Sequence, residues 1–229
     1  MAEIVVALDH PTGDEALALL DRLPRARWVK VGSVLFTREG PALVETLRVR
    51  GLEVFLDLKW HDIPNTVAGA VRSAAALGAA MATLHTLGGR EMMAAAREAA
   101  GSLRLVGVTV LTSHDAASFG QAVGRDAVEI GTEALRLADE AMAAGLAGLV
   151  CSPAEVGALR GRLGKGALLV VPGIRAAGAP ADDQRRTASA GEAAAAGATH
   201  LVVGRPITGA ADPGAVLDRL VAEAGAGGR

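Results

Sequence analysis

A lysine between two aspartates, in the segment Asp57-Leu58-Lys59-Trp60-His61-Asp62, is the feature of this sequence best suited to chemistry. Opposite charges favour each other's charged forms, so Lys59 is expected to remain an ammonium group between the two carboxylates. Such a group can donate a proton to a carbanion. A carboxylate held beside an anionic group of the substrate raises the free energy of the enzyme–substrate complex. The repulsion between the two anions is relieved when the substrate group departs. Together with Lys30, which lies in an earlier apolar run, Asp57, Lys59 and Asp62 form a charged group that suits decarboxylation followed by protonation. The group does not suit Schiff-base chemistry, because that requires a neutral lysine.

The same segment predicts the strand that presents these charges. Residues 53–59 begin as an apolar run, and strand side chains alternate between two faces. Phe55, Asp57 and Lys59 therefore share one face, opposite Leu56. Because buried charges are costly unless they are paired, the charge pattern by itself also fits a structural ion-pair network at a strand end. Ile63-Pro64 is expected to end the strand, and Asn65-Thr66 to cap the next helix.

Similar apolar runs recur along the chain, with helical patterns between them. The predicted strands are residues 4–8, 28–32, 53–59, 81–85, 103–111, 148–151, 168–171 and 200–203. The predicted helices include residues 12 or 14 to 23, 41–50, 64–77, 89–100 and 128–144, with a glycine-containing loop before the last of these. Continuous apolar strands alternating with helices indicate a parallel sheet covered on its faces. We therefore expect an α/β protein, a single (β/α)₈ TIM barrel domain over residues 1–229 with a frayed tail at 224–229; a doubly wound open sheet is the lesser alternative.

The predicted barrel gathers the polar residues at one end. Five of them stand at or just after the carboxyl ends of different strands: Asp9, Lys59, Ser113, Arg175 and Arg205. Active sites of this fold are built at that end, which favours a functional site over a structural network. Gly204-Arg205 after the eighth strand, with Pro172-Gly173 after the seventh, fits the phosphate site of such barrels, where backbone N–H groups and an arginine fork hold the anion.

Composition excludes several other classes of protein. The 229 residues carry a net charge of -2 and only 2% aromatic side chains, which argues against nucleic-acid binding. Cys151, the only cysteine, follows an apolar run and is expected in the core; no disulfide within the chain is possible, which fits a reducing cytoplasm. Neither a signal peptide nor a membrane span is expected. The five histidines lack metal-ligand spacing, and no dinucleotide or ATP motif occurs.

The segment from Asp57 to Thr66 resembles the signature of the orotidine 5'-phosphate decarboxylase family, whose reaction is the last step of UMP synthesis. Other blocks resemble the family in the family's order: residues 7–9, 30–32, 108–113, 150–153, 172–175, 182–185 and 203–207. The resemblance implies that Lys59 donates a proton to C6 after CO₂ leaves and that Asp57 lies against the substrate carboxylate. Lys30 and Asp62 would complete the charged network.

The resemblance also implies how the substrate is held. Asp9 and Lys30 would bind ribose hydroxyls, and Thr112 and Ser113 the pyrimidine. The phosphate end would be formed by Pro172, Arg175, Gln184, Gly204 and Arg205, with Gln184 on a loop that closes over the ligand. Asp62, Ile63 and Thr66 would come from a partner subunit, which makes a homodimer with shared sites necessary for activity. No cofactor or metal is implied.

Three positions depart from the family pattern: Val171 where threonine is common, Leu87 where a small residue is expected, and Ser189-Ala190 in place of a threonine–proline pair. None removes a catalytic group. Magnesium-dependent sugar-phosphate decarboxylases and hexulose phosphate synthases share the barrel and the charged core, but require a metal-binding carboxylate on the second strand, where this chain has Lys30. If the chain were a non-catalytic ligand-binding barrel, we would expect part of the charged group of Lys30, Asp57, Lys59 and Asp62 to be missing, yet all four residues are present.

Overall fold

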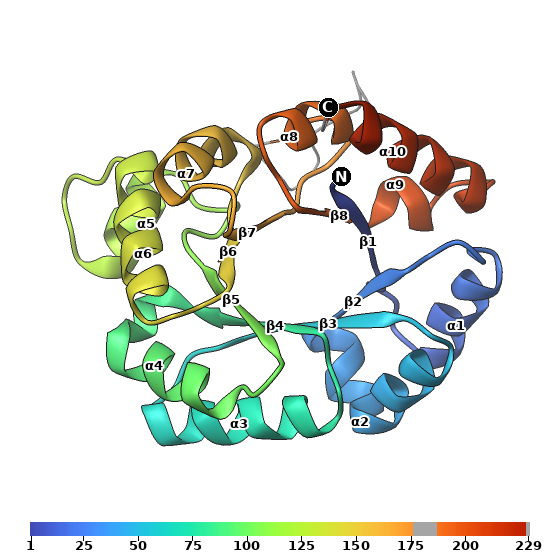
Figure 1. Ribbon diagram of the computed structural model, residues 1–229, viewed down its shortest axis with the longest axis horizontal. Helices are drawn as coiled ribbons and strands as arrows, with labels where there is room; N and C mark the ends of the chain where they lie inside the picture. Colours follow the sequence, from blue (N-terminus) through green and yellow to red (C-terminus); the bar gives the residue numbers. More distant parts are fainter. Residues whose placement is uncertain (176–186, 228–229) are drawn as a thin grey trace.

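Eight parallel strands close into a barrel in the computed structural model, which describes residues 1–175 and 187–227. Each strand pairs with its neighbours in sequence, and β8 pairs with β1 to complete the ring (Figure 1). The strands are β1 (Glu3–Ala7), β2 (Trp28–Gly32), β3 (Glu53–Trp60), β4 (Met81–His85), β5 (Arg104–Val108), β6 (Gly148–Val150), β7 (Leu168–Val171) and β8 (His200–Val203). The closed ring confirms the barrel and excludes the open doubly wound sheet.

Helices surround the ring of strands (Figure 1). They are α1 (Gly13–Asp21), α2 (Ser33–Val49), α3 (Pro64–Ala76), α4 (Gly89–Ala99), α5 (Ala116–Val123), α6 (Ile130–Ala143), α7 (Val156–Leu163), α8 (Ala190–Ala195), α9 (Arg205–Thr208) and α10 (Pro213–Gly227), with short 3₁₀ turns η1 (Thr86–Gly88) and η2 (Pro153–Glu155). Over the described part of the chain, no helix has the length and apolar character to cross a membrane.

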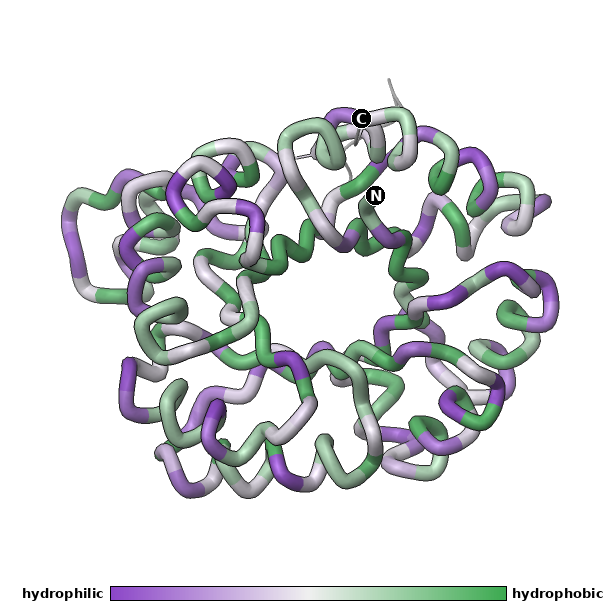
Figure 2. The backbone as a smooth tube through the Cα atoms, in the orientation of Figure 1, coloured by the Kyte–Doolittle hydropathy of each residue, from purple (hydrophilic) through white to green (hydrophobic). Residues whose placement is uncertain are grey.

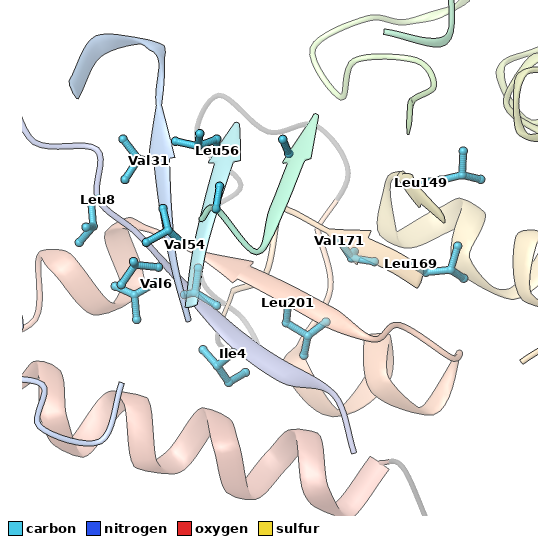
Figure 3. Packing of buried hydrophobic residues seen from close by; sticks show 14 of the residues in the cluster. Ile4, Val6, Leu8, Val31, Val54, Leu56, Leu149, Leu169, Val171 and Leu201 are labelled. Carbon is cyan, nitrogen blue, oxygen red and sulfur yellow. The ribbon is translucent and has the colours of Figure 1, made fainter. Parts of the chain in front are cut away.

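The two faces of each strand bury different sets of apolar side chains. Val54 and Leu56 belong to the large cluster between strands and helices, part of which is drawn in Figure 3. Phe55 belongs to a smaller cluster inside the barrel, with Trp28 and Met81. Figure 2 shows the hydrophobic residues concentrated along the ring of strands. The alternation predicted for β3 is therefore confirmed, and it directs the charged residues beyond Phe55 to the inside of the barrel.

One helix begins earlier than predicted, and another begins at the predicted residue but without its predicted cap. The helix predicted at 41–50 begins earlier, at Ser33, and α2 is interrupted at Gly40, which has φ 63° and ψ -153°. Pro41 explains the interruption, because a proline disfavours helical backbone in the residue before it. The predicted cap at Asn65-Thr66 is wrong: α3 begins at Pro64, and Ile63 is its N-cap residue without a side-chain hydrogen bond.

Two further segments are more helical than predicted. Residues 116–123, predicted as part of a loop, form α5, which Asp115 and Ser118 begin with reciprocal side-chain hydrogen bonds. The tail was predicted to fray from Ala224, yet α10 continues to Gly227, and Ala224 is fully buried. Burial of an apolar face stabilises this last turn in spite of its glycines.

An aromatic and cationic cluster closes the amino-terminal end of the barrel. His200, at the start of β8, lies edge-on to Trp28 with ring centroids 5.0 Å apart, and the guanidinium of Arg104 lies 4.9 Å from the Trp28 ring. The Nδ1 atom of His200 is 2.9 Å from the hydroxyl of Thr199. His200 is only 5% exposed. Burial lowers the pKa of His200 to about 4, and the positive charge of Arg104 acts in the same direction.

This histidine is expected to make folding stability depend on pH. Because the pKa of His200 is about 4 in the folded chain and 6.5 as its ordinary value, the folded state resists protonation. Its stabilising contribution is complete above pH 6.5 and is lost as the pH falls toward 4, by about 3 kcal/mol. Urea unfolding at pH 7.5 and 4.5 measures this loss. The variant His200→Gln is expected to lose less stability over the same interval; an equal loss would assign the effect to other groups.

Candidate active site

A cavity of about 510 Å³ opens where the carboxyl ends of the strands meet. Most of the residues that sequence analysis assigned to substrate line it: Asp9, Lys30, Asp57, Lys59, Thr112, Pro172, Arg175, Gly204 and Arg205. A volume of this size suits a small-molecule ligand. The barrel therefore brings together side chains from strands that are far apart in the sequence.

Four charged groups of alternating sign form a chain along one wall of the cavity. The ammonium of Lys30 lies 2.9 Å from Asp9 Oδ1 and 3.7 Å from Asp57 Oδ2. The ammonium of Lys59 lies 2.8 Å from the other oxygen of Asp57, Oδ1. The side chains of Lys30 and Asp57 are only 11% and 15% exposed, so solvent screens this part of the chain weakly. One carboxylate is thus held between two ammonium groups.

Local backbone geometry makes room for these charges. A methyl group on Gly32, at the end of β2, would lie 3.1 Å from the ammonium nitrogen of Lys30. The absence of a side chain at Gly32 therefore leaves Lys30 free to lie between its two carboxylates. Strand β3 is irregular where it carries Asp57 and Lys59, because its pairing register with β4 shifts between Leu56 and Trp60.

Sequence analysis missed Thr83, whose side chain is fully buried beside this irregular segment. Its hydroxyl donates a hydrogen bond to Asp57 Oδ1 at 3.1 Å and accepts one from the backbone N–H of Lys59 at 2.8 Å. The available signal was its position: Thr83 is a polar residue within an apolar strand, two residues after Met81, and therefore shares with Met81 the face that points to the inside of the barrel.

The loops after β7 and β8 form another part of the cavity, next to the Asp9 end of the charge chain. Gly173 has φ 82°, a left-handed conformation that glycine adopts without strain, and Arg175 is buried. Gly204 and Arg205 follow β8 and line the cavity, together with Thr208, which sequence analysis did not assign. Backbone N–H groups and guanidinium groups in such a loop pair are suited to bind a phosphate. Gln184, also assigned to this end, lies outside the described residues.

The third part of the cavity is largely apolar. Thr112 lines this part, whereas Ser113, which sequence analysis also assigned to it, is exposed and does not line it. The walls between are formed by Val108, Val150, Val170 and Cys151. Cys151 is 1% exposed and belongs to the main core cluster, which confirms it as a core residue, although it also borders the cavity.

Asp62, Ile63 and Thr66 lie away from this cavity. Asp62 and Ile63 line a separate hollow at the surface, and Thr66 is exposed. Asp62 Oδ1 accepts a hydrogen bond from the N–H of Ile63 at 2.6 Å. Among the described residues, Lys59 is paired with Asp57 and forms no ion pair with Asp62. Within one chain, Asp62 therefore does not pair with Lys59, and the expectation that Asp62 of a partner subunit does so stays a prediction.

Two histidines lie near Lys59 without lining the cavity, and His61 borders the surface hollow instead. The rings of His85, at the end of β4, and His61 have centroids 5.7 Å apart. Burial lowers the pKa of His85, and the neighbouring His61 and Lys59 act in the same direction, while Asp57 opposes them. His85 is thereby favoured in its neutral form. Across residues 1–175 and 187–227, no cluster of three His, Cys, Asp or Glu side chains is suitably placed to hold a metal ion.

The three departures from the family pattern lie outside the charge chain. Val171 is fully buried and packs in the main core cluster. Leu87 is 39% exposed and borders the same surface hollow as Asp62. Ser189 is the N-cap residue of α8 and exchanges hydrogen bonds with Glu192, which is a helix-starting role that threonine also fills.

Comparison with known proteins identifies similar chains. The sequence model of the "Orotidine 5'-phosphate decarboxylase / HUMPS family" matches residues 2–220. A Halorhodospira halophila protein named orotidine 5'-phosphate decarboxylase is 54% identical, over 98% of this chain and 97% of that protein. An Alkalilimnicola ehrlichii protein of the same name is 53% identical, over 97% and 96%. The crystal structure of orotidine 5'-phosphate decarboxylase from Lactobacillus acidophilus superposes with a TM-score of 0.87 at 34% identity, over 97% of this chain and 99% of that one.

Proposed function

The chain belongs to the orotidine 5'-phosphate decarboxylase / HUMPS family, and from this premise we propose that it converts orotidine 5'-monophosphate to UMP and CO₂ without a metal ion. The family name covers more than one reaction. The relatives that are 54% and 53% identical over nearly their full lengths are named for the decarboxylase, so the chain is an enzyme of the carboxy-lyase class. We place its reaction in pyrimidine biosynthesis on the same ground.

The alternating charge chain is the observation that carries the proposal. A magnesium-dependent member of the wider family requires a carboxylate from the second strand. Here that strand supplies Lys30, which lies against both Asp9 and Asp57. An ammonium group in this place repels a divalent cation and neutralises the carboxylates that would bind one. The arrangement supports charge-based catalysis at Asp57 and Lys59 over metal-based catalysis.

The two ends of the cavity orient the substrate in this proposal. The phosphate binds at the loops after β7 and β8, to Gly204, Arg205 and Arg175, with Gln184 closing over it. Asp9 and Lys30 hold the ribose hydroxyls, and Thr112 contacts the pyrimidine; Ser113, which does not line the cavity, is assigned no contact with the substrate. Binding at the phosphate, far from the reacting carbon, supplies free energy that is used to hold the substrate carboxylate against Asp57.

The reaction then requires one bond to break and one to form. The bond between C6 and the carboxyl carbon breaks, CO₂ departs, and the electron pair remains on C6. Departure of the carboxylate relieves its repulsion by Asp57. The ammonium of Lys59 donates a proton to C6, which gives UMP, and Lys59 regains a proton from solvent. The ion pair between Lys59 and Asp57, at 2.8 Å, supports this role.

The direct test is the loss of substrate absorbance when purified protein is mixed with orotidine 5'-monophosphate in excess EDTA. Rapid loss with formation of UMP is the expected result. Magnesium and a keto-sugar phosphate, supplied in place of the nucleotide, test the rival reaction. Activity with the sugar phosphate alone, and dependent on magnesium, would contradict the proposal.

We further propose that the active enzyme is a homodimer in which each site is completed by the partner subunit. Asp62 lies outside the cavity of its own chain, next to Ile63, which is 66% exposed, and Leu87, which is 39% exposed. Exposed apolar side chains around a carboxylate are suited to a protein interface. In the dimer, Asp62, Ile63 and Thr66 of one chain reach the Lys59 end of the other chain's cavity.

Mixing two inactive variants tests this shared site. Lys59→Ala and Asp62→Ala are each expected to be nearly inactive as homodimers. After mixing, unfolding and refolding together, half of the dimers combine one chain of each kind, and one of their two sites contains both native residues. Activity is then expected to recover to about a quarter of the wild-type value. No recovery, with dimers shown to have exchanged, would assign Asp62 to its own chain or to a structural role.

A further inference from the structure

Strand β3 contains a bulge at the two residues on which the proposed chemistry depends. Leu56 pairs with Ala82 and Trp60 pairs with Leu84, so Asp57, Leu58 and Lys59 together face a single β4 residue, Thr83. Among the described residues, Lys59 is the one non-glycine residue with a positive φ, 51°. Such a conformation costs about 1 kcal/mol or more and persists only where its surroundings fix it.

The hydroxyl of Thr83 fixes this segment at both ends. It accepts a hydrogen bond from the N–H of Lys59 at 2.8 Å, in place of the backbone carbonyl that a regular ladder would offer. The same hydroxyl donates to Asp57 Oδ1 at 3.1 Å, and that oxygen also receives the ammonium of Lys59 at 2.8 Å. Thr83 is 0% exposed, so water does not compete for either hydrogen bond. One buried side chain thus determines the direction of the carboxylate and the backbone from which the lysine extends.

We infer that Thr83 is a positioning residue for the decarboxylation, acting through Asp57 and Lys59 without contacting the reacting atoms itself. This inference rests on the proposed function. The one proton of the hydroxyl group is donated in a hydrogen bond to Asp57 Oδ1. The other carboxylate oxygen, Asp57 Oδ2, then faces the ammonium of Lys30 at 3.7 Å. Without the hydroxyl, the carboxylate is free to rotate, and the bulge loses the acceptor for the Lys59 N–H. The ammonium of Lys59 is then no longer held at a fixed position relative to C6.

Thr86 provides a matched control for Thr83. It lies just after the same strand and is 2% exposed, and its hydroxyl donates to the backbone carbonyl of Val108 at 2.8 Å. Valine has the shape of threonine without the hydroxyl, so Thr83→Val and Thr86→Val each remove one buried hydroxyl and its hydrogen bonding. Only the first of these hydroxyls touches a charged residue of the proposed site.

The experiment compares kcat and KM for orotidine 5'-monophosphate in the wild type and in these variants, with thermal unfolding of each. Thr83→Val is expected to lower kcat by about 10- to 100-fold and to change KM by less than about threefold, since the phosphate end is untouched. Thr86→Val is expected to lower the unfolding temperature with little effect on kcat. Thr83→Ser, which restores the hydroxyl, is expected to recover most of the kcat.

The outcomes separate this inference from the proposed function. A wild type that does not decarboxylate the nucleotide overturns the proposed function and this inference with it. An active wild type whose Thr83→Val variant keeps its kcat, or loses no more of it than Thr86→Val, overturns the inference alone. If Thr83→Val does not fold, Thr83→Ala replaces it, because the smaller side chain leaves space for a water molecule to bond to the Lys59 N–H. A folded Thr83→Ala variant with the kcat of the wild type would also overturn it.

Discussion

Lys59→Ala is expected to lower kcat for orotidine 5'-monophosphate by about 10⁴-fold or more, because it removes two effects together. It removes the proposed proton donor to C6, and a positioned general acid contributes about 10²–10⁴-fold. It also removes a cation that lies 2.8 Å from Asp57 and that, in the proposed mechanism, stabilises the charge that develops at C6. Binding of UMP is expected to change far less, because the phosphate end of the cavity is untouched. Single-turnover absorbance measurements and calorimetric titration of UMP separate the two quantities.

Lys165→Ala is the control for this variant. Lys165 is exposed and precedes β7 at the opposite end of the barrel from the cavity. Its replacement removes an equal charge and side chain and is expected to leave kcat unchanged. A Lys59→Ala variant that binds UMP normally and retains kcat within about tenfold of the wild type would show that another group protonates C6.

Asp57→Asn is expected to lower kcat by about 10³-fold or more while leaving KM unchanged or lower. The amide has nearly the same shape as the carboxylate but no charge, so the proposed repulsion that raises the energy of the bound substrate carboxylate disappears. The substrate then binds at least as tightly and reacts more slowly. The ammonium groups of Lys30 and Lys59 also lose the anion that they share. Steady-state kinetics with orotidine 5'-monophosphate measures both constants.

Asp9→Asn provides the comparison, because Asp9 is the exposed end of the same charge chain and lies 2.9 Å from Lys30. If Asp9 holds the ribose, its replacement is expected to act mainly on KM. We therefore expect Asp57→Asn to affect mainly kcat and Asp9→Asn to affect mainly KM. A rise in KM with unchanged kcat for Asp57→Asn would reduce Asp57 to a substrate-binding residue.

The strands were predictable because each is a short apolar run whose two faces are both buried. The alternation of Phe55, Asp57 and Lys59 against Val54 and Leu56 needed no tertiary information, and the two core clusters divide in the same way. Helix starts were less predictable. The first part of α2, before Gly40, and all of α5 depend on packing and local capping that apolar periodicity does not show.

The residues of the charged site could be predicted from the sequence, but their arrangement in space could not. Spacing along β3 suggested Lys59 between Asp57 and Asp62, yet the bulge turns the backbone, and the two aspartates point to different places. A register shift depends on the neighbouring strand, so no reading of β3 by itself predicts it. Thr83 was missed for the same reason: its importance comes from facing the bulge, and its own strand is otherwise an ordinary apolar run.

A crystal structure of EDTA-treated protein with bound UMP would test the central proposal most directly. We expect Lys59 Nζ to lie within about 3 Å of C6, the phosphate to lie on Gly204 and Arg205, and Asp62 from a partner subunit to lie beside Lys59. A uracil ring bound at Arg205, or C6 turned toward the apolar wall and out of reach of Lys59, would contradict it.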